Sequence, residues 1–291
     1  IAAALLSYYF NSHKYIGIYQ DFEKPQEGVK RTSSLKIIPL PHPVGEENVT
    51  TDERHVVKKR FSKKHPKEET TKATPSMTKA KLAIVIDDLG TPQDMQELKK
   101  LSLTLNYAFF PYNPEMSTQS LSKSVSTPLI HLPLEALNYK DENPTLTIKS
   151  TQEEINQTIG SIRHDFPHIS LINNHTGSRF TESCEAMERL LIALDHFGFE
   201  FLDSKTSTRS CALKSAQGMG LKIWERDVFL DHDPDVTVIK KQILEAIACA
   251  KEKGSCIAIG HPRPTTLQAL RELHTQLQEV TLVQLREIPH P

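Results

Sequence analysis

Six short, mostly apolar runs in this 291-residue sequence each lead into an acidic residue, a histidine or an asparagine. They cover residues 83–86, 128–130, 169–172, 199–202, 221–224 and 256–260, and segments with helical periodicity separate most of them. Strands that alternate with helices usually pair in parallel through right-handed crossovers. The carboxyl ends of parallel strands carry the active sites of α/β barrels and open α/β sheets. The pattern therefore predicts an α/β fold with a functional site at its strand ends.

The number of strand–helix units favours a barrel. Seven or eight units fit into residues 79–291, which is typical of an irregular (β/α)7 barrel with parallel strands. An open, doubly wound sheet is the alternative. No Gly-x-Gly-x-x-Gly or Walker loop follows any of the runs, which argues against a nucleotide-binding fold.

Local signals place the ends of several elements. Thr151 and Glu154 predict a capping box for a helix over residues 151–166. Asp235 predicts the start of a long helix that Gly254 ends, and Gly198 ends a helix over residues 181–197. Pro133 is expected to end the strand over residues 127–132. Residues 173–179 are expected to form a polar turn.

The sequence before residue 79 differs from the rest. Residues 1–10 are uncharged and mostly apolar, but a helix needs about 20 residues to span a bilayer. We interpret them as the end of a signal peptide or membrane anchor, with a short buried strand as the alternative. Residues 11–78 are rich in Lys, Glu, Pro, Ser and Thr and predict a flexible charged linker. Together they favour an exported protein of the periplasm or envelope.

Composition excludes several classes of function. A net charge of -1 argues against a general nucleic-acid binder. The four cysteines form no Cys-x-x-Cys pair, so no zinc ribbon or redox motif is present. There is no Gly-x-Ser-x-Gly elbow of an α/β-hydrolase.

Three strand ends carry candidate metal ligands. Asp87 and Asp88 follow the first run, and two adjacent carboxylates suit one metal ligand and one general base. His131 follows the run over residues 128–130, with Glu135 four residues later. His175 comes shortly after the run over residues 169–172. Imidazole and carboxylate together are typical ligands of Zn²⁺.

Other polar residues at strand ends are candidates for substrate contact or support. His261 is placed to act as general acid or to stabilise an oxyanion. Asn174 is expected to orient His175 or bind substrate, and Arg179 to pair with a carboxylate. The remaining candidates support the site: Asp203 as partner of a ligand histidine, and Arg226 with Asp227 as a buried pair that fixes Asp87, or as an ordinary salt bridge.

Several motifs, in this order, resemble those of the divergent polysaccharide deacetylase family, which is related to the NodB-type carbohydrate esterases. The matching segments are residues 86–90, 131–135, 173–180, 201–204, 226–231 and 259–262. The resemblance covers residues 81–288 and implies an irregular NodB-like barrel. It also implies metal-dependent removal of acetyl groups from an N-acetylated polysaccharide or peptidoglycan-type sugar.

The resemblance further implies roles for individual residues. Asp87 corresponds to the catalytic base, Asp88 to a metal ligand and His261 to the general acid. The family's His-x-x-x-His motif is here His131-x-x-x-Glu135, so either His175 replaces the missing imidazole or Glu135 binds the metal directly. We expect Zn²⁺ on Asp88, His131 and His175. A non-catalytic envelope protein that binds glycan or a protein partner in the barrel groove is the alternative.

Overall fold

The computed structural model describes residues 79–112, 118–139 and 144–291. These residues lie in a compact unit that spans Met77–Pro291. The predictions for residues 1–10 and 11–78 lie outside the described residues. Within the described part of the chain, no helix combines the length and apolar character needed to cross a membrane.

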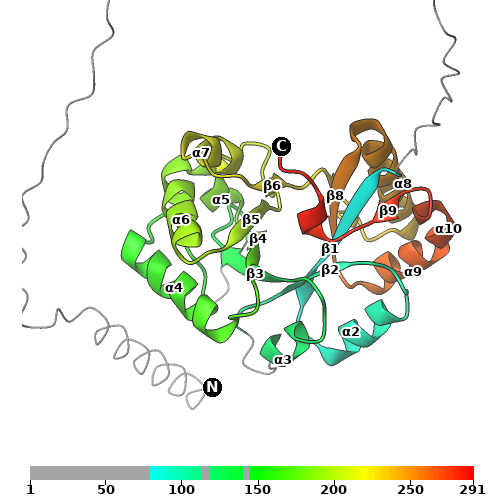
Figure 1. Cartoon of the computed structure of the whole chain (residues 1–291), viewed down its shortest axis with the longest axis horizontal. Coiled ribbons are helices and arrows are strands. Elements are labelled where there is room, and N and C mark those ends of the chain that lie inside the picture. The colour runs from blue at the N-terminus through cyan, green and yellow to red at the C-terminus, as the bar shows by residue number, and fades with distance from the viewer. Residues whose placement is uncertain (1–78, 113–117, 140–143) are drawn as a thin grey trace, which may run out of the picture. The chain divides into compact units, whose positions relative to one another are not determined.

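Strands and helices alternate along most of this unit (Figure 1). The strands are β1 (Lys81–Leu89), β2 (Asn106–Phe109), β3 (Pro128–Leu134), β4 (Leu171–Thr176), β5 (Glu200–Asp203), β6 (Trp224–Glu225), β7 (Val228–Phe229), β8 (Ser255–Gly260) and β9 (Thr281–Leu282). The helices are α2 (Pro92–Lys99), α3 (Thr118–Ser122), α4 (Gln152–Asp165), α5 (Ser178–Glu182), α6 (Cys184–His196), α7 (Ala212–Gly218), α8 (Val236–Lys253), α9 (Pro264–Glu272) and α10 (His274–Leu277), and a 3₁₀ helix covers Leu285–Glu287.

The strands form one curled parallel sheet in the order β6-β5-β4-β3-β2-β1-β8-β7, and β9 pairs with the start of β1. Neighbours in this order are also neighbours in the chain, apart from the β1–β8 pair, which joins the first strand of the described unit to a strand near its C-terminal end. A doubly wound sheet would reverse its strand order at a switch point. The predicted parallel α/β barrel fold is therefore confirmed, as a curled sheet in which β6 and β7 are the two edges.

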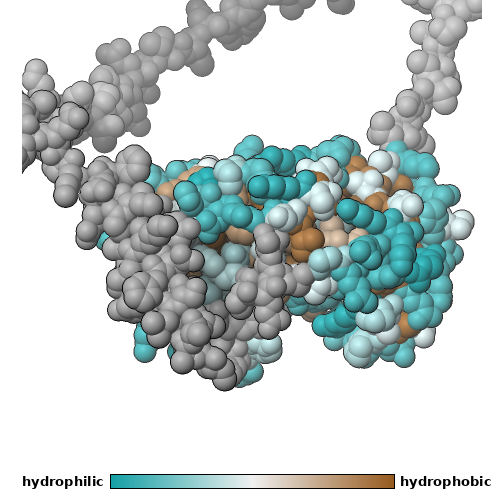
Figure 2. Space-filling view, turned by 90° about the horizontal axis from the view of Figure 1, so that it is seen from below, coloured by the Kyte–Doolittle hydropathy of each residue, from teal (hydrophilic) through white to brown (hydrophobic). Residues whose placement is uncertain are grey.

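The two faces of the sheet have separate apolar cores. Outward-facing side chains of the strands pack against the helices in two clusters, one around β1 and α8 and one around β4 and α6. A third cluster fills the inside of the curl with Ala83, Val85, Leu129, Leu171, Leu202, Ile257 and Ile259, among others. On the face drawn in Figure 2, the visible surface of the described residues is mostly hydrophilic, with small apolar patches.

The inward-facing positions lead directly to the candidate site, because side chains alternate between the two faces of a strand. In β1 the inward positions 83 and 85 are followed by Asp87. The same alternation takes Leu129 to His131, Leu171 to Asn173, and Ile259 to His261. The interior of the curl is thus apolar at the starts of the strands and polar at their ends.

The C-terminal segment covers the apolar end of the interior. Val283, Leu285 and Ile288 join the inner cluster, and the indole nitrogen of Trp224 donates to the carbonyl of Ile288 at 3.0 Å. Asn106, fully buried, accepts from the amide of Leu285 at 2.8 Å. Inside the curl of the described residues, the C-terminal segment therefore leaves the carboxyl ends of the strands for a site.

The predicted helix ends are confirmed. Thr151 and Glu154 form a capping box at α4, and the Asp235 side chain accepts hydrogen bonds from two amides at the start of α8. Gly198 and Gly254 follow α6 and α8 with φ values of 71° and 84°, which glycine adopts without strain.

Other predicted boundaries are wrong. Pro133 does not end β3, because β2 pairs only as far as Ile130, so the missing amide of Pro133 removes no bond to that strand. The helix predicted over residues 181–197 is two helices, because Ser183 is extended and caps α6. The turn predicted at residues 173–179 starts later, since β4 continues to Thr176.

Candidate metal centre

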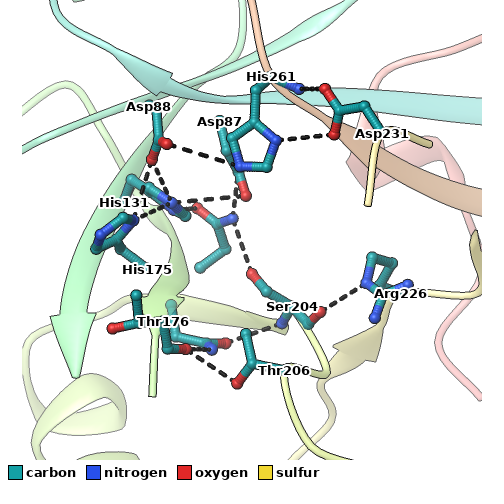
Figure 3. A network of polar contacts seen from close by, with 12 residues as sticks. Asp87, Asp88, His131, His175, Thr176, Ser204, Thr206, Arg226, Asp231 and His261 are labelled. Atoms are coloured by element: carbon teal, nitrogen blue, oxygen red, sulfur yellow. Dashed lines mark hydrogen bonds and ion pairs between the residues drawn. The ribbon is translucent and has the colours of Figure 1, made fainter. Parts of the chain in front are cut away.

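Three ligand atoms from β1, β3 and β4 meet at the polar end of the curl (Figure 3). Asp88 Oδ1 lies 3.2 Å from His131 Nε2 and 3.0 Å from His175 Nδ1. The two ring nitrogens are 3.2 Å apart. Bonds of about 2.1 Å from one cation to all three atoms, at angles of about 90–110°, require separations of about 3.0–3.4 Å. The triangle therefore has the size that a single divalent cation needs.

Asn173 fixes the tautomer of His131. The amide nitrogen of Asn173 donates to Asp87 Oδ1 at 2.8 Å, and to Ser204 Oγ at 3.1 Å, so its oxygen faces His131 Nδ1 at 3.1 Å. An amide oxygen only accepts, so Nδ1 carries the proton and a neutral His131 has its lone pair on Nε2. Nε2 then faces Asp88 Oδ1, which also only accepts. This contact is favourable only when a positive charge lies between the two atoms.

Either a proton or a metal ion between His131 Nε2 and Asp88 Oδ1 can carry that positive charge. Asp88 Oδ1 is buried and accepts no regular hydrogen bond from the described residues, although two ring nitrogens lie within 3.2 Å of it. Burial alone would lower the pKa of His131, but the carboxylates of Asp87 and Asp88 outweigh it and raise this pKa. The same carboxylates attract a metal ion, which would replace the proton at neutral pH. The donor set of two imidazoles and one carboxylate fits Zn²⁺.

The backbone of β1 turns both of its carboxylates into the site. Its register shifts between Ile86 and Leu89, and Asp88 has a φ of 58°, which is uncommon for a residue other than glycine. Burial would raise the pKa of Asp88, but the close contacts with His131 and His175 prevail and hold it well below its usual value. Asp88 is therefore an anion in the folded protein, as a metal ligand must be.

Asp87 lies beside the triangle but is held differently. Its Oδ2 is 3.6 Å from His131 Nε2, and its side chain is almost fully buried. Burial raises the pKa of Asp87 above its usual value, against the opposing effect of His131 and His261. A carboxylate with a raised pKa accepts a proton more readily, which is the property that a general base needs.

His261 approaches from β8 and is oriented by Asp231. His261 Nε2 lies 3.6 Å from Asp88 Oδ2, while its Nδ1 lies 2.9 Å from Asp231 Oδ1. The fully buried Asp231 also accepts from the His261 amide at 2.8 Å and from Thr266 Oγ1 at 2.7 Å. Burial would lower the pKa of His261, but the bond to Asp231 raises it, so His261 holds a proton to higher pH than a free imidazole. Its Nε2 is the atom presented to the site.

The structure does not bring Glu135 to the triangle. Its Oε2 accepts from the amide of Ile148 at 2.8 Å, and its Oε1 lies 3.4 Å from Arg179. Arg179 thus pairs with a carboxylate, as the sequence predicts, but at the surface. This arrangement does not support a direct ligand role for Glu135. The second imidazole of the triangle is that of His175.

Asn174 and Asp203 hold the loop that follows β5. The Asn174 oxygen accepts from the amide of Ser204 at 2.8 Å, and its nitrogen donates to the carbonyl of Thr176 at 2.7 Å. Asp203 accepts from the amide of Lys205 at 2.8 Å and from Ser210 Oγ at 2.6 Å. Its carboxylate is thus directed at this loop rather than at a ligand histidine. Since Ser204 accepts from Asn173, the loop supports the site indirectly.

Arg226 and Asp227 do not form the predicted pair around Asp87. Arg226 donates to the carbonyls of Ser204 and Lys205 at 2.6 and 2.8 Å. Asp227 accepts from Lys253 at 2.7 Å and from the amide of Ile257 at 2.9 Å, at the other end of β8. That prediction is wrong because residues 226 and 227 connect β6 to β7, where consecutive side chains point in opposite directions.

Residues 84–288 match the protein family described as divergent polysaccharide deacetylase. The chain belongs to this family. The uncharacterised protein YibQ of Escherichia coli (strain K12) is 37% identical over 209 residues, 70% of this chain and 65% of that protein. An uncharacterised protein of Haemophilus influenzae (strain ATCC 51907 / DSM 11121 / KW20 / Rd) is 31% identical over 200 residues, 67% of this chain and 71% of that one. The chain thus spans about two thirds of these relatives.

A solved structure shares the fold of this divergent deacetylase-family chain. The crystal structure of the uncharacterised protein ATU2773 from Agrobacterium tumefaciens C58 has a TM-score of 0.61 and 19% identity, and the match covers 71% of this chain and 87% of that one. At this identity the similarity concerns the fold alone. The fold of this chain is NodB-like, as the sequence predicts.

Two residues that orient the side chains of the candidate metal centre were not identified from the sequence. Asn173 bridges Asp87 and His131, and Asp231 orients His261. Alternation along β4 identifies Asn173 once Leu171 is known to face inward. Asp231 follows a strand of two residues, too short to give an apolar run, and no spacing signal marks it. The roles of the other candidates at the centre stay predictions.

Proposed function

We propose that this chain is a metal-dependent hydrolase that removes acetyl groups from N-acetylated polysaccharide or peptidoglycan-type sugars. The observation that carries the proposal is the triangle of Asp88 Oδ1, His131 Nε2 and His175 Nδ1, with Asp87 and His261 beside it. Membership in the divergent polysaccharide deacetylase family supports an N-acetylated glycan as substrate.

The flanking residues divide the proton transfers between them. Asp88, His131 and His175 would hold a divalent cation, which would supply Lewis acidity to the water and to the acetamide carbonyl. Asp87, with its raised pKa, takes the proton of the attacking water. His261, protonated at Nε2 and oriented by Asp231, gives a proton to the leaving amine as the C–N bond breaks. The products are acetate and a free amino sugar.

A groove with both polar and apolar lining, which includes Thr176 next to His175, suits a sugar chain. It has a volume of about 480 Å³, and Asn138, Tyr139, Thr176, Thr206 and Ser207 are among its lining residues. The Tyr139 ring is exposed and lies 6.5 Å from the His175 ring, centre to centre. Hydroxyl and amide groups bind sugar hydroxyls, and an exposed aromatic ring covers the apolar face of a pyranose. The groove thus supports an N-acetylated glycan as substrate.

We also propose that the protein is exported. Cys184 and Cys211 form a disulfide that joins the start of α6 to the loop before α7. Disulfides persist in oxidising compartments such as the periplasm and are rare in the cytosol. The interpretation of residues 1–10 as a signal or anchor segment is consistent with this proposal.

Acetate release tests the proposed activity. Protein loaded with Zn²⁺ is incubated with oligomers of N-acetylglucosamine, and acetate is measured over time. We expect release that Asp87→Asn lowers by at least about 100-fold while its bound metal is retained, because the base is lost and the ligands are not. Glu135→Gln serves as the control and keeps the activity. Glycan binding without acetate release, by wild type loaded with Zn²⁺, Co²⁺, Ni²⁺ or Mn²⁺, would support the non-catalytic alternative instead.

A further inference from the structure

A second cluster of metal-binding groups lies at the opposite end of β8. The sulfurs of Cys249 and Cys256 and a carboxylate oxygen of Asp227 all lie within 4.8 Å of one another. Cys256 is the second residue of β8, whereas His261 directly follows the last. About five residues, or about 16 Å of strand, therefore separate the two sites. The cluster therefore has no part in the proposed deacetylation.

Three different elements bring these groups together. Cys249 is in the last turns of α8, Cys256 is on the face of β8 that packs against α8, and Asp227 is in the link between β6 and β7. Neither cysteine takes part in the disulfide of this chain. Because all three positions belong to packed elements, the cluster is part of the fold rather than a chance meeting of mobile side chains.

The carboxylate is held in place before any ion binds. Asp227 Oδ2 accepts from the amide of Ile257 at 2.9 Å, and the Asp227 amide donates to the Ile257 carbonyl at 2.9 Å. These two bonds fix the side chain against the edge of β8. Its Oδ1 is left for a positive partner, and Lys253 fills that place with its ammonium at 2.7 Å.

We propose that Asp227, Cys249 and Cys256 form a binding site for a thiophilic cation such as Zn²⁺, Cd²⁺ or Cu⁺. Thiolates select these ions, and a carboxylate oxygen is a regular third ligand for zinc. Binding of a divalent ion releases one proton from each thiol to the solvent, and the ammonium of Lys253 leaves Asp227. The Lys253 side chain is 57% exposed, so it moves into water without disturbing the core. The exposed Asp227 and the half-buried Cys249 give solvent access to the cluster, whereas Cys256 is buried.

Lys253 occupies the carboxylate oxygen of Asp227 that the metal ion would bind. Its ammonium competes with the metal ion for the same carboxylate, so removing it strengthens metal binding. An exposed ion pair of this kind contributes up to about 1 kcal/mol, which corresponds to about twofold to fivefold in affinity. A cluster with a purely structural role would show no such gain.

Cadmium is the probe that reports on sulfur ligands, because thiolate binding to Cd²⁺ produces a charge-transfer band in the ultraviolet. The full chain carrying His175→Ala, which weakens the first centre, is titrated under anaerobic conditions without added thiol, so that the Cys184–Cys211 disulfide stays closed. We expect one equivalent of Cd²⁺ with this band, at least 100-fold weaker binding in Cys249→Ser, weaker binding in Asp227→Asn, and tighter binding in Lys253→Gln.

The same titration has outcomes that overturn the proposal. They are a missing band in the parent chain, an unchanged affinity in Cys249→Ser, or weaker binding in Lys253→Gln. A thiol assay of the native protein that finds Cys249 and Cys256 joined as a second disulfide also overturns it. Cys249 is half-buried and near the end of α8, so its replacement by serine leaves the fold intact and keeps the test decisive.

Discussion

Asp231 Oδ1 lies 2.9 Å from His261 Nδ1, and the carboxylate of Asp231 is completely buried. The contact joins the second residue after β7 to the first residue after β8, so it depends on the pairing of these two strands. It decides which nitrogen of His261 faces the centre and raises the pKa of the ring. A residue that touches neither the candidate ligands nor the groove thus sets the acid of the proposed reaction.

Asp231→Asn should therefore change the pH dependence of activity. Asp231 raises the pKa of His261, so the variant loses the protonated acid at a lower pH than the wild type does. The alkaline limb of the kcat profile shifts to lower pH, and kcat at neutral pH falls at least about tenfold. Asp235→Asn is the matched control, because asparagine caps α8 as well as aspartate does. An unshifted alkaline limb in Asp231→Asn would remove His261 from the role of acid.

The same pair predicts how stability depends on pH. The folded-state pKa of Asp231 is depressed by His261, so its contribution is present above the unfolded value of about 3.8 and is lost as pH falls through the folded value. The pKa of His261 is raised, so its contribution is present below about 6.5 and is lost as pH rises through the folded value. Urea unfolding of the metal-free protein should show that Asp231→Asn costs about 1.5–3 kcal/mol near pH 5 and less near pH 9. An equal cost at both pH values would show that the pair is not ionic.

Asn173→Leu should weaken metal binding without changing any ligand. Asn173 orients His131 through its oxygen and Asp87 through its nitrogen. Loss of such a partner typically costs about 10-fold to 100-fold in metal affinity. Asn106→Leu is the matched control, because Asn106 is equally buried but lies at the apolar end of the curl. Both variants lose stability, and only Asn173→Leu should bind metal more weakly in calorimetric titration.

Tyr139→Ala tests the groove. If the exposed ring covers the face of a bound sugar, its loss raises KM by about threefold to tenfold, the value of one aromatic contact. We expect kcat to change little, since the ring binds substrate and transition state alike. Leu244→Ala, which removes an exposed apolar side chain on α8, provides the comparison. A drop in kcat at constant KM would place Tyr139 in the chemistry instead.

The strand-end pattern of the sequence predicted most of what the structure brings together. Asp87, Asp88, His131 and His261 follow or end apolar runs, and alternation along each strand turns their side chains inward or into the turn. His175 was expected in a turn, but it lies in β4, which extends past its apolar residues because Asn173 is satisfied inside the curl.

The rest was not predictable from local pattern. The break between α5 and α6 comes from Ser183, which caps the second helix, although the residues around it have helical periodicity. Asp231 is far from His261 in sequence and meets it only because β7, a strand of two residues, pairs with β8. Contacts between elements distant in sequence, rather than propensity, determine both the errors and the omissions.

The most direct test of the account is the metal content of three purified proteins that all carry Cys249→Ser to disable the thiolate cluster: the otherwise wild-type chain, His175→Ala and Glu135→Gln. After dialysis against buffer with one equivalent of Zn²⁺, elemental analysis should find one tightly bound ion in the otherwise wild-type chain and in Glu135→Gln. His175→Ala should lose this ion, because two ligands remain of three. Full retention of the ion by His175→Ala, or its loss from Glu135→Gln, would contradict a centre built on Asp88, His131 and His175.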